Sequence, residues 1–251
     1  MSRIIGHRGL AGEAPENTLA GIRLAAERGL KWVEVDVTLS GDGTLVLFHD
    51  RRLNRTTNKK GRLKTLTCSD LATIDAGSWF SEQFSGEQIP QLGAALKLIK
   101  ELGLGLNLEL KTNGCSEPRL VEAVVKTIAE VELPNDRLLV SSFNYAALVR
   151  FSDCSDIPVG CLFERLPMNW QKKALRVNAV SIHLNSKRTA KRHISRVKSK
   201  GYELYCYTVN SPAVARQLID DGVDGVFSDY PLADHKKHGG EVPAVTEEIT
   251  T

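Results

Sequence analysis

Residues 32–38 read WVEVDVT, and residues 106–111 read LNLELK. Side chains alternate between the two faces of a β-strand, so Glu34 and Asp36 share one face, while Glu109 lies on the polar face of the second segment. If both strands belong to a closed parallel sheet, their polar faces meet inside it. Three carboxylates held out of water repel one another and are costly unless a cation lies among them. The two segments therefore predict a metal site inside a barrel.

The rest of the chain supports a closed sheet. Strand-like segments alternate with amphipathic helical segments, as in barrels of this length, and no glycine-rich dinucleotide or P-loop motif favours an open, doubly wound sheet. We predict an α/β fold, a (β/α)8 TIM barrel, in a single domain over residues 1–238. The predicted strands are 3–6, 31–38, 105–111, 137–141, 158–163, 179–183, 203–208 and 224–228, and the predicted helices include 18–28, 93–102, 118–131, 189–200 and 212–221.

One region interrupts this alternation. A turn at 40–43 leads into a second short apolar run, 45–48, which ends at His49-Asp50. Residues 51–92 are then rich in Thr, Gly, Asn and Lys, with a short helical stretch near 69–74, and we predict a small inserted subdomain after the second strand. Long excursions in compact domains are often lids or binding loops. Residues 239–251 are expected to form a flexible tail.

Composition narrows the class of protein. The 251 residues are 42% hydrophobic and 25% charged, with a net charge of +3, which does not by itself argue for a nucleic-acid partner. Five scattered cysteines without a C-x-x-C pair argue against a disulfide framework or a zinc site and fit a reducing compartment. We expect a cytoplasmic protein without a signal peptide or a transmembrane segment.

The acidic side chains also indicate the kind of metal. Glu34, Asp36 and Glu109 offer only oxygen ligands, which suit a hard cation such as Mg²⁺, Ca²⁺ or Mn²⁺ rather than zinc. The alternative interpretation is a pair of strands whose polar faces lie in solvent. It fits an antiparallel sheet better than a sheet covered by helices.

Two histidines and two cations lie where a ligand would reach this site. His7 and Arg8 follow the first strand, at the end of a barrel where active sites lie, although such a sequence alone is typical of surface turns. His49 ends the hairpin, and with His7 it suggests an acid/base pair. The Arg8 guanidinium suits phosphate or carboxylate oxygens. Lys111 would either neutralise Glu109 or hold an anionic substrate, and we favour the second role.

A basic run at 187–193, continued by Arg196, Lys198 and Lys200, raises the question of nucleic-acid binding. Its charges alternate with Ile194 and Val197 on a predicted outer helix, and no aromatic stacking residues accompany them. We interpret the run as a solvated helix face and predict no nucleic-acid partner.

These motifs together resemble the glycerophosphodiester phosphodiesterase family. No motif is decisive alone, but their order and spacing are specific, and the resemblance extends from about residue 3 to residue 232. The family's fold is a TIM barrel with a small subdomain after the second strand, and its reaction yields sn-glycerol 3-phosphate and an alcohol. The matching motifs are HRG at 7–9, PENT at 15–18, ExD at 34–36, DG at 42–43, HD at 49–50, RTT at 55–57, ExK at 109–111, SF at 142–143, YTVN at 207–210, GVDG at 222–225 and DYP at 229–231.

The resemblance also implies roles for individual residues. It makes His7 and His49 the acid/base pair, and Arg8 and Lys111 the phosphate-binding cations. The ligands of one divalent metal ion, Mg²⁺ or Ca²⁺, would be Glu34, Asp36 and Glu109, and Phe143 and Tyr207 would lie near a small-molecule glycerophosphodiester. The family usually has Trp where this chain has Tyr207, which puts the leaving-group preference in question.

The sequence is also compatible with two other functions. A related barrel phosphodiesterase could act on lysophospholipids or sphingomyelin and give a cyclic phosphate product. The chain could also be a non-catalytic phosphate-binding module, although such a module would be expected to lack a histidine or a metal ligand, and every core position is filled here.

Overall fold

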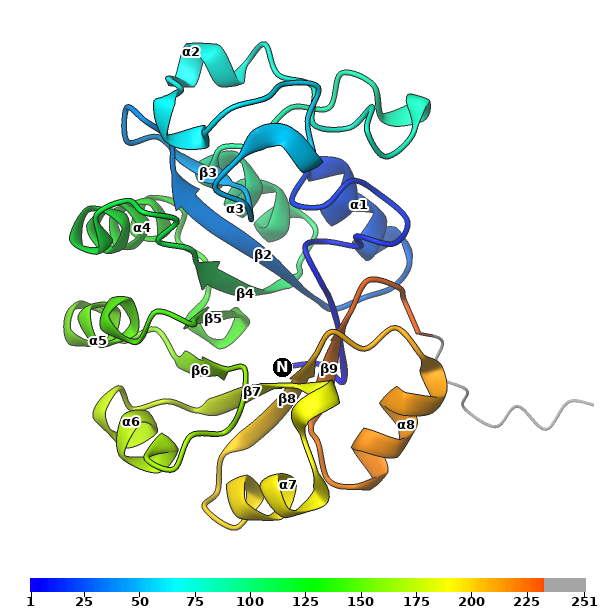
Figure 1. Cartoon of the computed structure of the whole chain (residues 1–251), viewed down its shortest axis with the longest axis vertical. Helices are drawn as coiled ribbons and strands as arrows, with labels where there is room; N and C mark the ends of the chain where they lie inside the picture. Colours follow the sequence, from blue (N-terminus) through cyan, green and yellow to red (C-terminus); the bar gives the residue numbers. More distant parts are fainter. Residues whose placement is uncertain (233–251) are drawn as a thin grey trace, which may run out of the picture.

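The structure, a computed structural model, describes residues 1–232. Eight parallel strands form a barrel that closes where β1 pairs with both β2 and β9. Figure 1 shows the strands at the centre of the molecule with helices around them. The predicted TIM barrel is confirmed. Its strands are β1 (Ile4–Gly6), β2 (Trp32–Leu39), β4 (Gly105–Leu110), β5 (Leu138–Ser142), β6 (Val159–Phe163), β7 (Ser181–Asn185), β8 (Glu203–Tyr207) and β9 (Gly225–Ser228).

The helices cover the outside of the barrel, and their buried side chains pack with those of the strands in one continuous apolar core. Thr18 caps the first of them by accepting a hydrogen bond from the Gly21 backbone, and Asn144 caps α5 in the same way. Helices α5 and α6 lie outside the helices named from the sequence. The helices are α1 (Leu19–Glu27), α3 (Leu92–Glu101), α4 (Glu117–Val131), α5 (Tyr145–Cys154), α6 (Trp170–Arg176), α7 (Lys191–Lys198) and α8 (Pro212–Asp220), with single 3₁₀ turns at Asn135–Arg137 and Ser186–Arg188.

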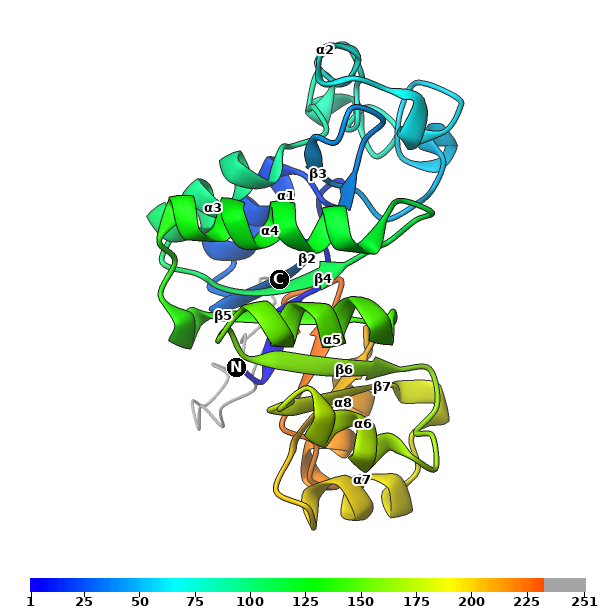
Figure 2. The same cartoon turned by 90° about the vertical axis from the view of Figure 1, so that its left-hand side faces the viewer.

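The excursion after β2 has its own small core. Strand β3 (Leu45–Leu47) pairs antiparallel with β2, and the segment that follows contains η1 (Leu53–Arg55), η2 (Leu63–Thr65), α2 (Cys68–Leu71) and η3 (Glu82–Phe84). Its apolar side chains pack on one another, and Figure 2 shows the segment at the side of the barrel toward which the arrowheads of β4 and β6 point. The domain bounds 1–238 and 51–92 stay predictions, and the predicted tail at 239–251 lies outside the described residues.

The register between β2 and β4 determines what fills one side of the barrel. Glu34 lies opposite Asn107, and Asp36 lies opposite Glu109. The polar faces of the two strands therefore form adjacent layers inside the barrel, while the alternate valines and leucines pack outward against the helices. This register confirms that the acidic faces point inward, and it rejects the alternative of two solvated strand faces.

Three further observations bear on the predictions from composition and charge. Within residues 1–232, no helix is long and apolar enough to cross a membrane. All five cysteines are free thiols. Helix α7 buries Ile194 and Val197, as predicted, while the absence of a nucleic-acid partner stays a prediction.

Candidate active site

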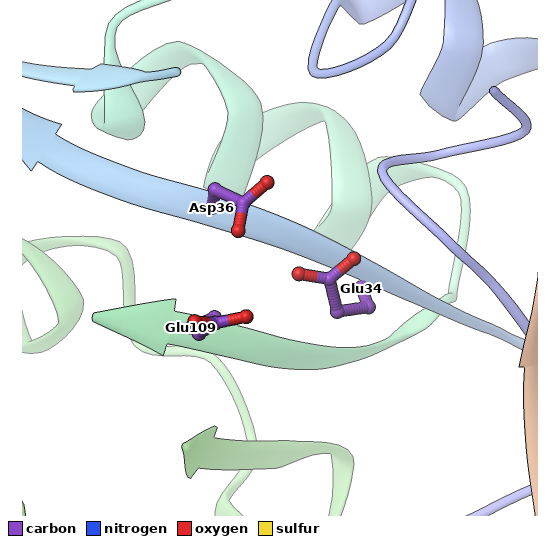
Figure 3. Close-up of side chains that lie close together, drawn as sticks. All are labelled: Glu34, Asp36 and Glu109. Carbon is purple, nitrogen blue, oxygen red and sulfur yellow. The ribbon is translucent and has the colours of Figure 1, made fainter. Parts of the chain in front are cut away.

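The three predicted metal ligands meet inside the barrel. Glu34 and Asp36 come from β2 and Glu109 from β4, and Figure 3 shows their carboxylates pointing into the same space. All three side chains are buried, and each offers a carboxylate oxygen within 4.8 Å of the other two. Three oxygens at these separations can surround a single cation.

The donor set fits a hard divalent cation. Oε1 of Glu34 is buried and has no hydrogen-bond partner among the described residues, so a carboxylate oxygen is left for a ligand. Burial, reinforced by the charge of Asp36, raises the pKa of Glu34 well above its usual value and raises the pKa of Glu109 to about 7. A bound cation would remove both effects by favouring the ionised carboxylates.

Asp36 is held more firmly than the other two carboxylates. Asn17 donates to its Oδ2 at 2.8 Å and accepts from its backbone N–H at 2.9 Å. Lys111 and Arg8 each place a charged nitrogen 3.3 Å from its carboxylate. Burial acts to raise the pKa of Asp36, but the charges of Lys111 and Arg8 outweigh it and lower that pKa. Asp36 is therefore ionised even without a metal.

Arg8 is placed by an unusual turn. It adopts a left-handed φ of 52°, and its backbone N–H donates to Oε2 of Glu34 at 2.9 Å. Gly6 permits the turn, because a Cβ on Gly6 would lie 2.0 Å from the carbonyl oxygen of Gly9. The HRG motif thus positions both the backbone and the guanidinium of Arg8 beside the carboxylates.

Lys111 shows one of its two predicted roles directly. Its Nζ lies 2.7 Å from Oε1 of Glu109, so it neutralises that carboxylate in this structure. It also lines the cavity above the carboxylates, where an anion would meet it. Phosphate binding by Lys111 stays a prediction.

Each predicted acid/base histidine is tied to a carboxylate through Nδ1. His7 Nδ1 lies 2.7 Å from Asp229, and His49 Nδ1 lies 2.7 Å from Asp50. Hydrogen bonds from the histidines help to keep both carboxylates ionised, and an ionised carboxylate only accepts, so each Nδ1 carries the hydrogen. Burial lowers the pKa of His49. The Nε2 atoms are then free to exchange a proton with a ligand.

One cavity of about 220 Å³ connects these groups. It lies among His7, His49, Lys111 and the carboxylates Glu34 and Glu109. Both predicted substrate-binding aromatics also line it: Phe143 and Tyr207 pack edge to face with ring centres 5.7 Å apart. Lys111 Nζ lies 5.6 Å from the centre of the Phe143 ring. The aromatic pair forms the apolar wall of an otherwise charged cavity.

Several residues of the site were not among those predicted from the sequence. Asn17 is hydrogen-bonded to Asp36, and Asp229 and Asp50 are hydrogen-bonded to the two histidines. The fully buried His183 lines the cavity together with Leu162 and Phe227. The PENT, HD and DYP motifs contain Asn17, Asp50 and Asp229, which was the available signal. His183 had none, because its segment is an ordinary buried strand in the sequence.

Comparison with known proteins gives consistent matches along the chain. The sequence profile of the "Glycerophosphoryl diester phosphodiesterase family" matches residues 7–233. A glycerophosphodiester phosphodiesterase of Caldanaerobacter subterraneus subsp. tengcongensis is 33% identical over 91% of this chain and 94% of its own length. Another, of Bacillus altitudinis, is 33% identical over 92% of this chain and 96% of its own.

A solved structure matches as well. An Oleispira antarctica phosphodiesterase in complex with the product sn-glycerol-3-phosphate aligns with a TM-score of 0.89 and 39% identity. The alignment covers 92% of this chain and 94% of the other.

Proposed function

The chain belongs to the glycerophosphoryl diester phosphodiesterase family, and we propose that it hydrolyses glycerophosphodiesters to sn-glycerol 3-phosphate and an alcohol at a divalent metal site with histidine acid/base catalysis. Its relatives of similar length carry the name of that activity, and the Oleispira antarctica protein binds the product. The observation that supports the proposal most is the cavity in which Glu34 and Glu109, two of the three clustered carboxylates, face two carboxylate-tethered histidines. The five free thiols suit a reducing compartment, and we propose a cytoplasmic location.

The proposed roles follow from the contacts. Glu34, Asp36 and Glu109 would hold one Mg²⁺ or Ca²⁺ ion, whose charge would neutralise phosphate oxygens and stabilise the transition state. Arg8 and Lys111 would add positive charge from the side of the cavity, and Phe143 and Tyr207 would contact the substrate. One histidine Nε2 would take a proton from the nucleophile, either water or the neighbouring glycerol hydroxyl, and the other would protonate the leaving alcohol. If the glycerol hydroxyl attacks, water would then open the resulting cyclic phosphate to give sn-glycerol 3-phosphate.

The product tests the proposed activity. Purified protein is incubated with glycerophosphocholine, glycerophosphoethanolamine, glycerophosphoglycerol and glycerophosphoinositol, with Mg²⁺, Ca²⁺ or EDTA, and products are followed by phosphorus NMR and a coupled glycerol-phosphate assay. We expect sn-glycerol 3-phosphate with at least one substrate and none in EDTA. A cyclic phosphate as final product would favour the lysophospholipid or sphingomyelin alternative. No turnover of any diester would favour the phosphate-binding module.

A divalent cation is expected to stabilise the fold. Bound at one hundred times its dissociation constant, it would add about 2.7 kcal/mol to the free energy of unfolding. For a domain of this size that corresponds to a rise in Tm of roughly 5–10 °C. Thermal unfolding in EDTA and in increasing Mg²⁺ or Ca²⁺ measures the effect, with Na⁺ at matched ionic strength as control. Equal Tm values in all of these buffers would contradict the proposed metal site.

The aromatic wall is expected to govern substrate binding more than turnover. Replacing Phe143 by Ala removes the ring that packs on Tyr207 and lies beside Lys111, so KM should rise several-fold while kcat changes less. Steady-state kinetics on the preferred diester measure both constants. Met168→Ala, at an exposed site outside the cavity lining, is the control. An unchanged KM in Phe143→Ala would remove this ring from the substrate site.

A further inference from the structure

One arginine of the inserted segment bridges two carboxylates beside the cavity. Arg55 is the last residue of η1. Its Nε and Nη2 lie 2.8 and 3.1 Å from the two carboxylate oxygens of Asp50. Its Nη1 and Nη2 lie 2.6 and 2.8 Å from those of Glu16. A single planar guanidinium therefore fixes two acidic side chains that are 34 positions apart in sequence (16 and 50), each through two hydrogen bonds.

The two carboxylates in turn hold two residues of the proposed site. Asp50 Oδ1 lies 2.7 Å from His49 Nδ1, and Glu16 Oε1 lies 2.8 Å from Arg8 Nη1. The backbone of His49 is held as well, because Asn113 donates to its carbonyl oxygen at 3.0 Å. The chain of contacts thus extends from the inserted segment to the acid/base histidine in one direction and to the phosphate-facing arginine in the other.

Building on the proposed function, we propose that Arg55 is a positioning residue that sets the orientation of the His49 ring through Asp50 and the orientation of the Arg8 guanidinium through Glu16. This assigns the first turn of the inserted segment a part in the reaction. Arg55 itself is absent from the cavity lining, so it acts through the two carboxylates rather than on the substrate.

The surroundings of these contacts distinguish them from an ordinary surface ion pair. Only 9% of the Glu16 side chain is exposed, although Arg55 is 44% exposed. Burial acts to raise the pKa of Asp50, but hydrogen bonds from Arg55 and His49 hold it at about 2. Asp50 therefore stays an acceptor at neutral pH, which keeps the hydrogen of His49 on Nδ1 and leaves Nε2 for the reaction. A double fork between two carboxylates is a geometry that lysine cannot reproduce.

Replacing Arg55 by Met tests the proposal. We expect kcat to fall between about tenfold and a hundredfold, because a misaligned catalytic group has an effect of that size, and KM to rise because Arg8 loses its guide. The control is Arg52→Met. Arg52 is exposed, lies just before the same turn, and forms no ion pair among residues 1–232. Arg52→Met should keep the kinetic constants of the wild type.

The pH profile separates positioning from simple loss of folded protein. The charges that face His49 are those of Asp50, Asp36, Arg8 and Lys111. Without Arg55, the negative charge of Asp50 is less compensated and favours the imidazolium form, so the limb of the kcat profile that reports His49 should move to higher pH. Arg55→Lys keeps a charge but not the fork, and it should restore the profile and kcat only in part.

The outcomes are distinct. A wild type that makes no sn-glycerol 3-phosphate contradicts the proposed function, whereas an active wild type with an Arg55→Met variant of unchanged kcat, KM and pH profile contradicts only this inference. The inference is also contradicted if Arg55→Met has a lower kcat but an unchanged pH profile and KM, and circular dichroism shows an equally lower folded fraction. If Arg55→Met melts below the assay temperature, the kinetics of Glu16→Gln test the proposal instead. This variant should raise KM and lower kcat, and wild-type kinetics in it would overturn the proposal.

Discussion

Replacing Glu34 by Gln is expected to lower kcat at least about a hundredfold and to remove the response of the protein to divalent metal. Oε1 of Glu34 is buried and has no hydrogen-bond partner within residues 1–232, and replacing Glu34 takes one of the three proposed ligands away. Gln has nearly the same shape and keeps a carbonyl oxygen that can accept from the Arg8 backbone N–H. The effect on activity should therefore not come from misfolding.

Thermal unfolding provides the check on that point. In EDTA, Glu34→Gln should melt at or above the temperature of the wild type, because one of three mutually repelling buried carboxylates is gone. The rise in Tm that metal gives the wild type should be absent. Glu101→Gln, an exposed carboxylate at the end of α3, is the matched control and should behave as the wild type. Metal-dependent turnover near the wild-type rate in Glu34→Gln would exclude Glu34 as a ligand.

The second large effect concerns the histidines. His49→Ala and His7→Ala should each reduce kcat by roughly a hundredfold or more, because each removes a group that carries a proton in the proposed reaction. The His7→Ala, His49→Ala double variant should lose less than the product of the two single losses, since residues that act as a unit are not additive. His49→Ala should also lose the limb of the pH profile that reports His49.

A control histidine lies outside the site. His193 on α7 accepts a hydrogen bond from the Ala190 backbone and is not part of the cavity lining, so His193→Ala should keep the wild-type kcat. Circular dichroism and the metal-induced rise in Tm should persist in both active-site variants. Full activity in His49→Ala would exclude that residue from the mechanism, and Arg55 would then act only on Arg8 through Glu16.

The fold was largely predictable because its signal is local. The alternation in residues 32–38 and 106–111 fixes which side chains face inward, and the register of β2 on β4 then brings Asp36 beside Glu109. The bounds of the predicted strands agree with the structure to within a few residues, because buried parallel strands are short apolar runs. Helix α6, Trp170–Arg176, is short and mostly polar, which explains why its segment gave no clear helical pattern.

The contacts that hold the site were not predictable in the same way. His7 meets Asp229 only because the last strand closes the barrel on the first, across 222 residues of sequence. Arg55 meets Glu16 because the inserted segment folds back over the loop before α1. Motif resemblance suggested that these residues matter, but only the three-dimensional arrangement shows which carboxylate each cation holds. The pairing of Lys111 with Glu109 is a similar case, because the sequence allowed Lys111 to pair either with Glu109 or with an anionic substrate.

The most direct test of the metal site is a crystal of the protein soaked in Mn²⁺, with anomalous diffraction collected at a wavelength where manganese scatters strongly. We expect one anomalous peak inside the barrel, in contact with carboxylate oxygens of Glu34, Asp36 and Glu109, and no such peak in crystals of Glu34→Gln. A peak that contacts other residues, or none in the wild type at a Mn²⁺ concentration that supports turnover, would contradict the assignment of these three carboxylates as the metal ligands.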